Sequence, residues 1–309
     1  MEVLAEIVRS GFVEGRHHGV VLLVDPGGDV VWSIGDPDTV IYPRSANKPL
    51  QALGMLRAGL PLQGRLLALS SASHSGEQFH LDGVREILAL AGLDESALQT
   101  PPSYPLDPQV HADYLRAGGV EAPICMDCSG KHAAMLLTCV TNDWPTGTYL
   151  SPKHPLQLEI AETFADLTGA RPATVGTDGC GAPLLATSLS RLARAIGAIV
   201  QSSSDSSERR LVDAMVAFPE YLSGTTRDEM QLMKAFPGAI AKSGAEGVYV
   251  VGMPDGSTFA LKIDDGADRA RAVVMAKALL LAGHTHLILD EEPVILGGGL
   301  PVGSIRAVF

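Results

Sequence analysis

The stretch Pro43-Arg44-Ser45-Ala46-Asn47-Lys48-Pro49-Leu50-Gln51-Ala52-Leu53 decides how the rest of the chain is interpreted. It opens the first pattern of helical spacing, which covers residues 48–58. Ser45 is therefore predicted near the start of a helix, with Lys48 one turn later on the same face. A lysine amine beside a serine hydroxyl can accept its proton and activate it as a nucleophile. The same spacing also fits a serine that caps the helix and a solvated lysine.

Patterns on both sides of this stretch predict an α+β fold. Residues 3–8, 19–24 and 29–34 are rich in Val, Leu and Ile, and predict strands with a turn at 25–28. Helical spacing occurs at 48–58, 81–91, 130–140, 154–167, 183–200 and 208–218. Strands are expected again at 247–253, 258–263 and 304–309, with a long apolar helix at 268–282.

Strands near both ends of the chain imply one antiparallel sheet built from distant segments, with a mainly helical part inserted between them. We therefore expect a single catalytic unit over residues 1–309. Within it, residues 1–47 and 236–309 contain the sheet, and residues 48–235 are mainly helical.

The composition indicates a small-molecule partner. The 309 residues carry a formal net charge of -12 that is spread along the chain, which argues against nucleic acid or an anionic membrane as the main partner. No apolar run approaches the ~20 residues of a membrane span, and the first residues lack a signal-peptide pattern. We expect a cytoplasmic protein.

Two further segments carry residues that suit the same chemistry. Ser70-Ser71-Ala72-Ser73-His74-Ser75-Gly76-Glu77 follows the apolar residues 66–69, and loops after buried strands often carry binding residues. A hydrogen-bonded serine-rich turn explains this segment equally well. In Ala239-Ile240-Ala241-Lys242-Ser243-Gly244, a lysine precedes a small hydroxyl residue and a glycine. Acyl-transfer enzymes with a SxxK nucleophile place such a segment on a strand beside the site, so Lys242 is a second candidate cation.

The four cysteines are Cys125, Cys128, Cys139 and Cys180, and we expect reduced thiols or a metal site instead of disulfides. Cys125-Met126-Asp127-Cys128-Ser129-Gly130-Lys131-His132 holds a CxxC pair and a histidine, while Thr177-Asp178-Gly179-Cys180 adds a distant thiol. Zinc prefers thiolate and imidazole ligands, although this spacing is not that of a zinc finger. A redox pair and ordinary buried cysteines remain open alternatives.

Taken together, these segments resemble the rhizobial-type (class 3) L-asparaginases of the asparaginase II family, and the likeness covers nearly the whole chain. It runs in family order through Ser10-Gly11-Phe12-Val13-Glu14-Gly15-Arg16-His17-His18-Gly19, the stretch 43–53, Ala72-Ser73-His74-Ser75-Gly76-Glu77, Cys128-Ser129-Gly130-Lys131-His132, Asp178-Gly179-Cys180 and Ala241-Lys242-Ser243-Gly244. Six ordered segments are far more specific than any one of them.

The resemblance implies a fold similar to serine β-lactamases and SxxK-type glutaminases, hydrolysis of asparagine to aspartate and ammonia, and a homodimer. It implies two serine–lysine pairs, Ser45 with Lys48 and Ser73 with Lys242. It also implies a zinc ion held by the metal ligands Cys128, Lys131 and Cys180. Arg44, His132 and Asp178 match family positions around the site, and Ser75 is a further candidate for substrate binding or support.

The expected mechanism is attack by Ser45 on the side-chain amide, followed by hydrolysis of the resulting ester by water. Whether Ser45 or Ser73 forms that ester stays open, as does a catalytic or a structural role for zinc. Arg44 would hold the substrate carboxylate or a neighbouring carboxylate of the protein. The alternatives are a glutaminase, another serine amidase, or a non-hydrolytic ligand-binding protein of the same fold.

Overall fold

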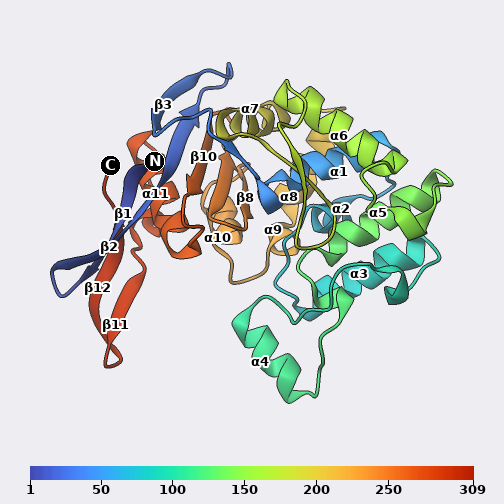
Figure 1. The fold of residues 1–309 in the computed structure, drawn as a ribbon, viewed down its shortest axis with the longest axis horizontal. Helices are drawn as coiled ribbons and strands as arrows, with labels where there is room; N and C mark the ends of the chain where they lie inside the picture. The colour runs from blue at the N-terminus through green and yellow to red at the C-terminus, as the bar shows by residue number, and fades with distance from the viewer. The chain divides into compact units, whose positions relative to one another are not determined.

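An antiparallel sheet is built from strands near both ends of the chain, as the sequence pattern predicted. Its strand order is β11-β12-β1-β2-β10-β9-β8, and β3 pairs with β2 beside this path. Figure 1 shows the blue N-terminal strands running beside the red and orange C-terminal strands. The strands are β1 (Glu2–Arg9), β2 (Phe12–Val24), β3 (Val30–Ile34), β8 (Ile240–Gly244), β9 (Val248–Gly252), β10 (Thr258–Ile263), β11 (Val294–Gly297) and β12 (Leu300–Ala307).

The computed structural model describes residues 1–309, apart from the side chain of Asp290, and the chain divides into two units. The sheet unit comprises Met1–Ala46, Thr187–Gln201 and Gln231–Phe309. The helical unit comprises Asn47–Ala186 and Ser202–Met230. The helix α7 (Leu189–Val200) thus comes from the middle of the chain yet belongs with the sheet.

Helices cover both faces of the sheet. A Cβ placed on Gly252 of β9 would lie 2.8 Å from Val200 Cγ2, so this face of the sheet packs against α7. Tyr249 lies three positions earlier on the same strand and therefore faces the other way. Its ring lies 5.0 Å from the guanidinium carbon of Arg271, the first residue of α11 (Arg271–Leu281). Burial on both faces explains the nearly continuous apolar sequences of β9 and β10.

The helical unit is assembled around α5 (Ser129–Thr141), which is buried from Ser129 to Cys139 and contacts α1, α2, α3 and α6. A helix that is buried around most of its circumference must be apolar around most of it, as this one is. The other helices are α1 (Lys48–Arg57), α2 (Gly64–Ser70), α3 (Gln78–Leu90), α4 (Pro108–Arg116), α6 (Pro155–Thr168), α8 (Ser207–Ala217) and α9 (Pro219–Leu222), and α10 (Asp228–Ala235) crosses the boundary between the two units.

Two short sheets complete the fold. In the sheet unit, β4 (Val40–Ile41) pairs with β7 (Thr187–Ser188), and in the helical unit β5 (Val175–Thr177) pairs with β6 (Pro183–Leu185). Strands β6 and β7 occupy the start of the helix predicted at 183–200, so that part of the prediction is wrong. Helix α7 begins only at Leu189, where Ser188 caps it by accepting a bond from the Arg191 N–H.

A second difference concerns residues 66–69, whose apolar run was interpreted as a buried strand. They form α2, since a short apolar run alone does not separate a strand from a buried helix. The predicted helix at 268–282 begins as a 3₁₀ turn and becomes α11 at Arg271. In the described part of the chain, no helix combines the length and the apolar character needed to cross a membrane.

Candidate active site

Ser45 lies in a 3₁₀ helix, η1 (Arg44–Asn47), that runs directly into α1, in agreement with the predicted helix start. The preceding residue, Arg44, has a φ of 51°, a left-handed conformation that costs a non-glycine residue free energy. The turn closes where the Ala46 N–H donates to the Pro43 carbonyl at 3.0 Å. Ser45 is half-buried, so its hydroxyl is not sealed within the core.

Strand β8 approaches this turn closely because it ends in a glycine. A Cβ added to Gly244 would lie 2.4 Å from the Pro43 carbonyl oxygen and 3.2 Å from the Ser45 nitrogen. Lys242, two positions earlier, therefore projects from the same face of the same strand. It is 1% exposed, and its amine donates to the Ser243 carbonyl at 3.0 Å. The sheet unit thus brings the backbone of Ser45 against the strand that carries Lys242.

In the helical unit, Lys48 and Ser73 are in direct contact. The Lys48 amine is 2% exposed and donates to Ser73 Oγ at 2.9 Å. It also donates to the Ala72 carbonyl at 2.6 Å, and lies 3.3 Å from Asp127 Oδ2 in a salt bridge. Three acceptors surround the buried Lys48 amine, which is the number of N–H bonds that a lysine can offer.

The serine-rich segment is held rigidly by the chain around residue 222. Ser73 N–H donates to the Leu222 carbonyl at 3.0 Å, and Ser75 N–H donates to the Ser223 carbonyl at 2.8 Å. The Ser75 hydroxyl donates to that same carbonyl at 3.0 Å. Ser75, predicted to bind or support the substrate, thus fixes the loop that carries Ser73.

Two buried histidines are neutral: His74 in this loop and His80 in the following helix α3. Burial holds the pKa of His74 well below its ordinary value and lowers that of His80 to about 4. The Ser129 hydroxyl donates its hydrogen bond to the Ile124 carbonyl at 2.8 Å. It therefore accepts from His74 Nε2–H, also at 2.8 Å. The two rings stack with their centroids 5.1 Å apart. They add packing and hydrogen bonds beside Ser73 but no positive charge.

A second group in the helical unit gathers potential metal ligands. The sulfur atoms of Cys128 and Cys180 and a ring nitrogen of His132 all lie within 4.8 Å of one another, and all three residues are buried. The Lys131 amine donates to Cys180 Sγ at 3.3 Å. The set of Cys128, Lys131 and Cys180 that the resemblance implies is therefore brought together. His132, which the residue pattern offered as an imidazole ligand and the resemblance placed only near the site, lies among them.

The two thiols and the lysine of this group shift one another's pKa values. A hydrogen bond from the Cys128 thiol and the charge of Lys131 hold the pKa of Cys180 well below that of an ordinary thiol. The same hydrogen bond and burial raise the pKa of Cys128. Burial opposes the charge on Lys131, but the neighbouring cysteine sulfurs raise its pKa. A thiolate beside a second sulfur and an imidazole is the donor chemistry of a zinc site.

His132 supplies a further argument that the group fits a metal ion. A ring nitrogen of His132 lies within 4.8 Å of the Cys180 sulfur, and burial lowers the pKa of His132 so that the ring is neutral. Its buried Nε2 has no partner of good hydrogen-bond geometry among the described residues. Its Nδ1 lies 2.8 Å from the hydroxyl of Tyr149, which also accepts from the Gln99 N–H. A ligating histidine commonly has its other nitrogen held in this way. Tyr149 was not foreseen from the sequence.

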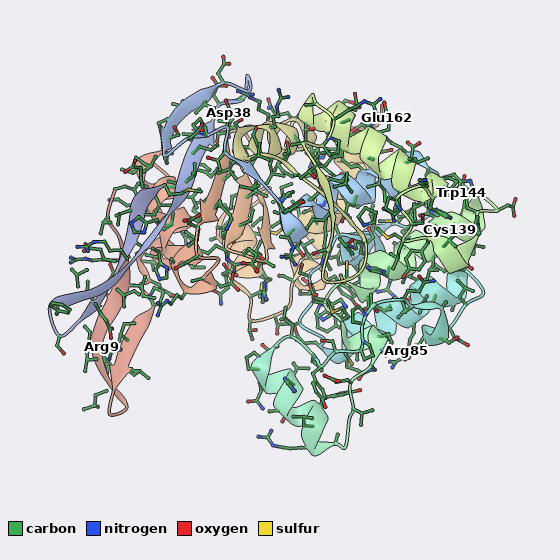
Figure 2. All side chains as sticks on the ribbon, in the orientation of Figure 1. Arg9, Asp38, Arg85, Cys139, Trp144 and Glu162 are labelled. Carbon is green, nitrogen blue, oxygen red and sulfur yellow. The ribbon has the colours of Figure 1, made fainter. Side chains whose placement is uncertain are left out.

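The remaining predicted residues flank these groups. Asp178 Oδ1 accepts from the Gly179 N–H at 2.9 Å and Oδ2 lies 3.6 Å from Cys180 Sγ, so its carboxylate borders the thiols. Arg44 lies 3.9 Å from Glu246 Oε1, which fits its expected alternative of holding a carboxylate of the protein. Cys139, labelled in Figure 2, is a separate buried thiol on α5 whose pKa burial raises to about 11.

The chain was compared with protein families, curated proteins and solved structures. Residues 5–306 match the L-asparaginase II family. Among curated proteins, none matches the sequence significantly. A β-lactamase from Mycobacterium bovis is similar in structure, with 15% identity and a TM-score of 0.49 over 85% of this chain and 94% of that one. A Bacillus glutaminase has 13% identity and a TM-score of 0.36 over 86% and 92%. The family match spans nearly the whole chain, so this protein belongs to the L-asparaginase II family.

Proposed function

We propose that this protein is an L-asparaginase that hydrolyses asparagine to aspartate and ammonia. The family match over residues 5–306 carries the proposal and supports an amidohydrolase. The cluster of Cys128, Lys131 and Cys180 supports it, because the resemblance implies these residues as metal ligands. The Lys48–Ser73 bond supports it in a different way, because it joins one member of each implied serine–lysine pair, although the implied partners were Ser45 for Lys48 and Lys242 for Ser73.

In the proposed mechanism, Ser45 Oγ attacks the side-chain carbonyl carbon of asparagine while a neutral lysine amine takes its proton. The C–N bond then breaks, and ammonia leaves with that proton. Water hydrolyses the aspartyl ester and restores the Ser45 hydroxyl. Ser45, Lys48, Ser73 and Lys242 are proposed to act on the same amide bond, with Ser73 passing protons to and from Lys48.

We propose that zinc is bound by Cys128, Cys180 and Lys131, with His132 beside them. The ion supplies a Lewis acid of reduced strength, since two thiolates already neutralise much of its charge. Lys131 can ligate it only as a neutral amine, so binding releases a proton from that residue. Asp178, at the edge of the thiol group, is proposed to orient the substrate.

The decisive experiment compares ammonia release from asparagine and from glutamine by the purified protein. Turnover of asparagine with a higher kcat/KM than glutamine supports an asparaginase, and the reverse order would make it a glutaminase. Absence of turnover on both amides would favour a binding protein and contradict the proposal. Metal analysis of the same preparation tests zinc.

We also propose a homodimer in the cytoplasm. The four cysteines are unpaired and buried, which suits a reducing compartment. Light scattering after gel filtration tests the dimer: a mass near 65 kDa is expected, twice the 32.4 kDa of one chain. Cell fractionation tests the location.

A further inference from the structure

We infer that Asp127 is a positioning residue that holds Lys48 and Ser73 in register with each other. This inference rests on the proposed function and deepens it. The residue lies directly before Cys128 in the cysteine-rich segment, and neither the sequence pattern nor the resemblance gave it a role.

Asp127 contacts both members of the Lys48–Ser73 pair, through different parts of its structure. Its carboxylate forms the salt bridge with the Lys48 amine at 3.3 Å. Its backbone carbonyl accepts from the N–H of His74, the residue after Ser73, at 2.9 Å. One residue thus fixes the lysine through its side chain and the serine loop through its main chain.

The need for such a residue follows from the lysine side chain. Four rotatable bonds leave a lysine amine poorly positioned unless its protons have fixed acceptors. Of the three acceptors of Lys48, the Ala72 carbonyl and Ser73 Oγ both belong to the serine loop. Asp127 Oδ2 is the acceptor that comes from another segment and the one that carries charge.

Basic side chains lie near the Asp127 carboxylate. The charged and titratable groups that interact with it include Lys48, Arg227, the neutral ring of His74 and the Cys128 thiol. The Asp127 side chain is 23% exposed, against 2% for Lys48, so it reaches from the solvent side toward a buried amine.

Asp127 lies next to the cluster of potential metal ligands, because it directly precedes Cys128 in the chain. Asp127 and Cys128 are adjacent, and the Ser129 N–H donates to the Met126 carbonyl at 2.9 Å, which starts α5 immediately behind them.

The test uses Asp127→Ala and Asp127→Asn in the full-length protein, with kcat and KM measured on asparagine. Asp127→Ala should lower kcat about a hundredfold and leave KM within about threefold, as expected when a catalytic group is misplaced. Asp127→Asn keeps an acceptor oxygen, so its kcat should be higher than that of Asp127→Ala. On a logarithmic scale, it should regain at least a third of the loss in kcat. The matched control is Asp166→Asn, which removes an exposed carboxylate from a salt bridge with Arg57 in the same unit and should keep the parent kcat.

A double-mutant cycle separates positioning from a general structural role. If Asp127 acts through Ser73 and Lys48, Asp127→Ala should change kcat less than about threefold in a Ser73→Ala background. Additive losses, a loss confined to KM, or parental kcat in Asp127→Ala would overturn the inference. If Asp127→Ala does not fold, the same comparison is made with Asp127→Asn. The inference then requires that Asp127→Asn lower kcat threefold or more in the parent protein, and that this decrease disappear in the Ser73→Ala background.

A fluorophosphonate that acylates active serines makes the two proposals separable. Slower labelling of Asp127→Ala in a protein that does not hydrolyse asparagine would leave the positioning role intact and refute the substrate. Parental labelling and kcat in Asp127→Ala, with asparagine hydrolysed, would refute the positioning role alone.

Discussion

The Lys48 amine donates a hydrogen bond to the Ser73 hydroxyl at 2.9 Å, across 25 positions of sequence. The lysine of the Ser45-Ala46-Asn47-Lys48 stretch is thus engaged with the serine of another segment. In the proposed reaction this contact makes Ser73 a proton carrier for Lys48, which is a role distinct from that of a second nucleophile. The predictions below test that division and the site around it.

Replacement of the two serines should separate their roles. Ser45→Ala should reduce ammonia release from asparagine by roughly a thousandfold or more, because it removes the attacking oxygen. Ser73→Ala should reduce kcat less, since water can replace a proton carrier in part. The control is Ser71→Ala, whose hydroxyl only bonds the Ala68 carbonyl within the same buried segment. Parental turnover in Ser45→Ala, or a covalent ester found on Ser73 by mass spectrometry, would reverse the assignment.

Gly244→Ala should disturb the Ser45 turn. The new methyl group would meet the Pro43 carbonyl oxygen at 2.4 Å, and backbone cannot move aside as a flexible side chain can. We expect a loss of about 1–3 kcal/mol in the free energy of unfolding, with a decrease in kcat. Gly147→Ala, which meets nothing within 4 Å, is the control for a glycine substitution as such. Equal melting temperatures and turnover for the two variants would contradict the close approach.

Removal of metal should destabilise the helical unit. A bound ion that contacts Cys128 and Cys180 stabilises the folded state by mass action, so chelation should lower the melting temperature by about 5 °C or more. Cys180→Ser should abolish binding of zinc, measured by atomic emission on the purified protein. Comparison of Lys131→Met with His132→Gln then identifies the third ligand as the residue whose loss lowers the zinc content. Full zinc content in Cys180→Ser would show that zinc is not bound by the cluster that contains Cys128 and Cys180.

Stability should fall in acid partly because of His80. Burial lowers its pKa from 6.5 to about 4 in the folded protein, so the unfolded chain binds more protons between these values. Above pH 6.5, His80 is neutral in both states and does not lower the free energy of unfolding. As the pH falls from 6.5 to 4, protonation of His80 in the unfolded chain lowers the free energy of unfolding by about 3 kcal/mol in total. Urea unfolding of the parent and of His80→Gln across this range should show a shallower pH dependence in the variant. Parallel curves would mean that His80 is not the group responsible.

The sequence was a good guide where local periodicity carries the information. Helical spacing located α1, α3, α5, α6 and α8 to within a few residues. The Val-rich segments located β3 and the half of β2 that pairs with it, but missed the first half of β2, residues 12–18. It failed at residues 183–188, where pairing with β5 and with β4 forms strands in place of the first turns of a helix. It also misread residues 66–69, because four apolar residues fit a buried helix as well as a strand.

For the site, residue types and their order predicted which segments carry chemistry, and the family match over residues 5–306 agrees with that interpretation. The sequence pattern by itself determined the α+β class and the candidate serines and lysines, and the family resemblance implied the grouping of Cys128 and Cys180 with Lys131. Only the tertiary structure placed Lys48 against Ser73 and Asp127, and the His132 nitrogen among the thiols. The physical reason is range: periodicity reports neighbours three or four positions apart, whereas the contact between Lys48 and Asp127 spans 79 positions and depends on how whole helices pack.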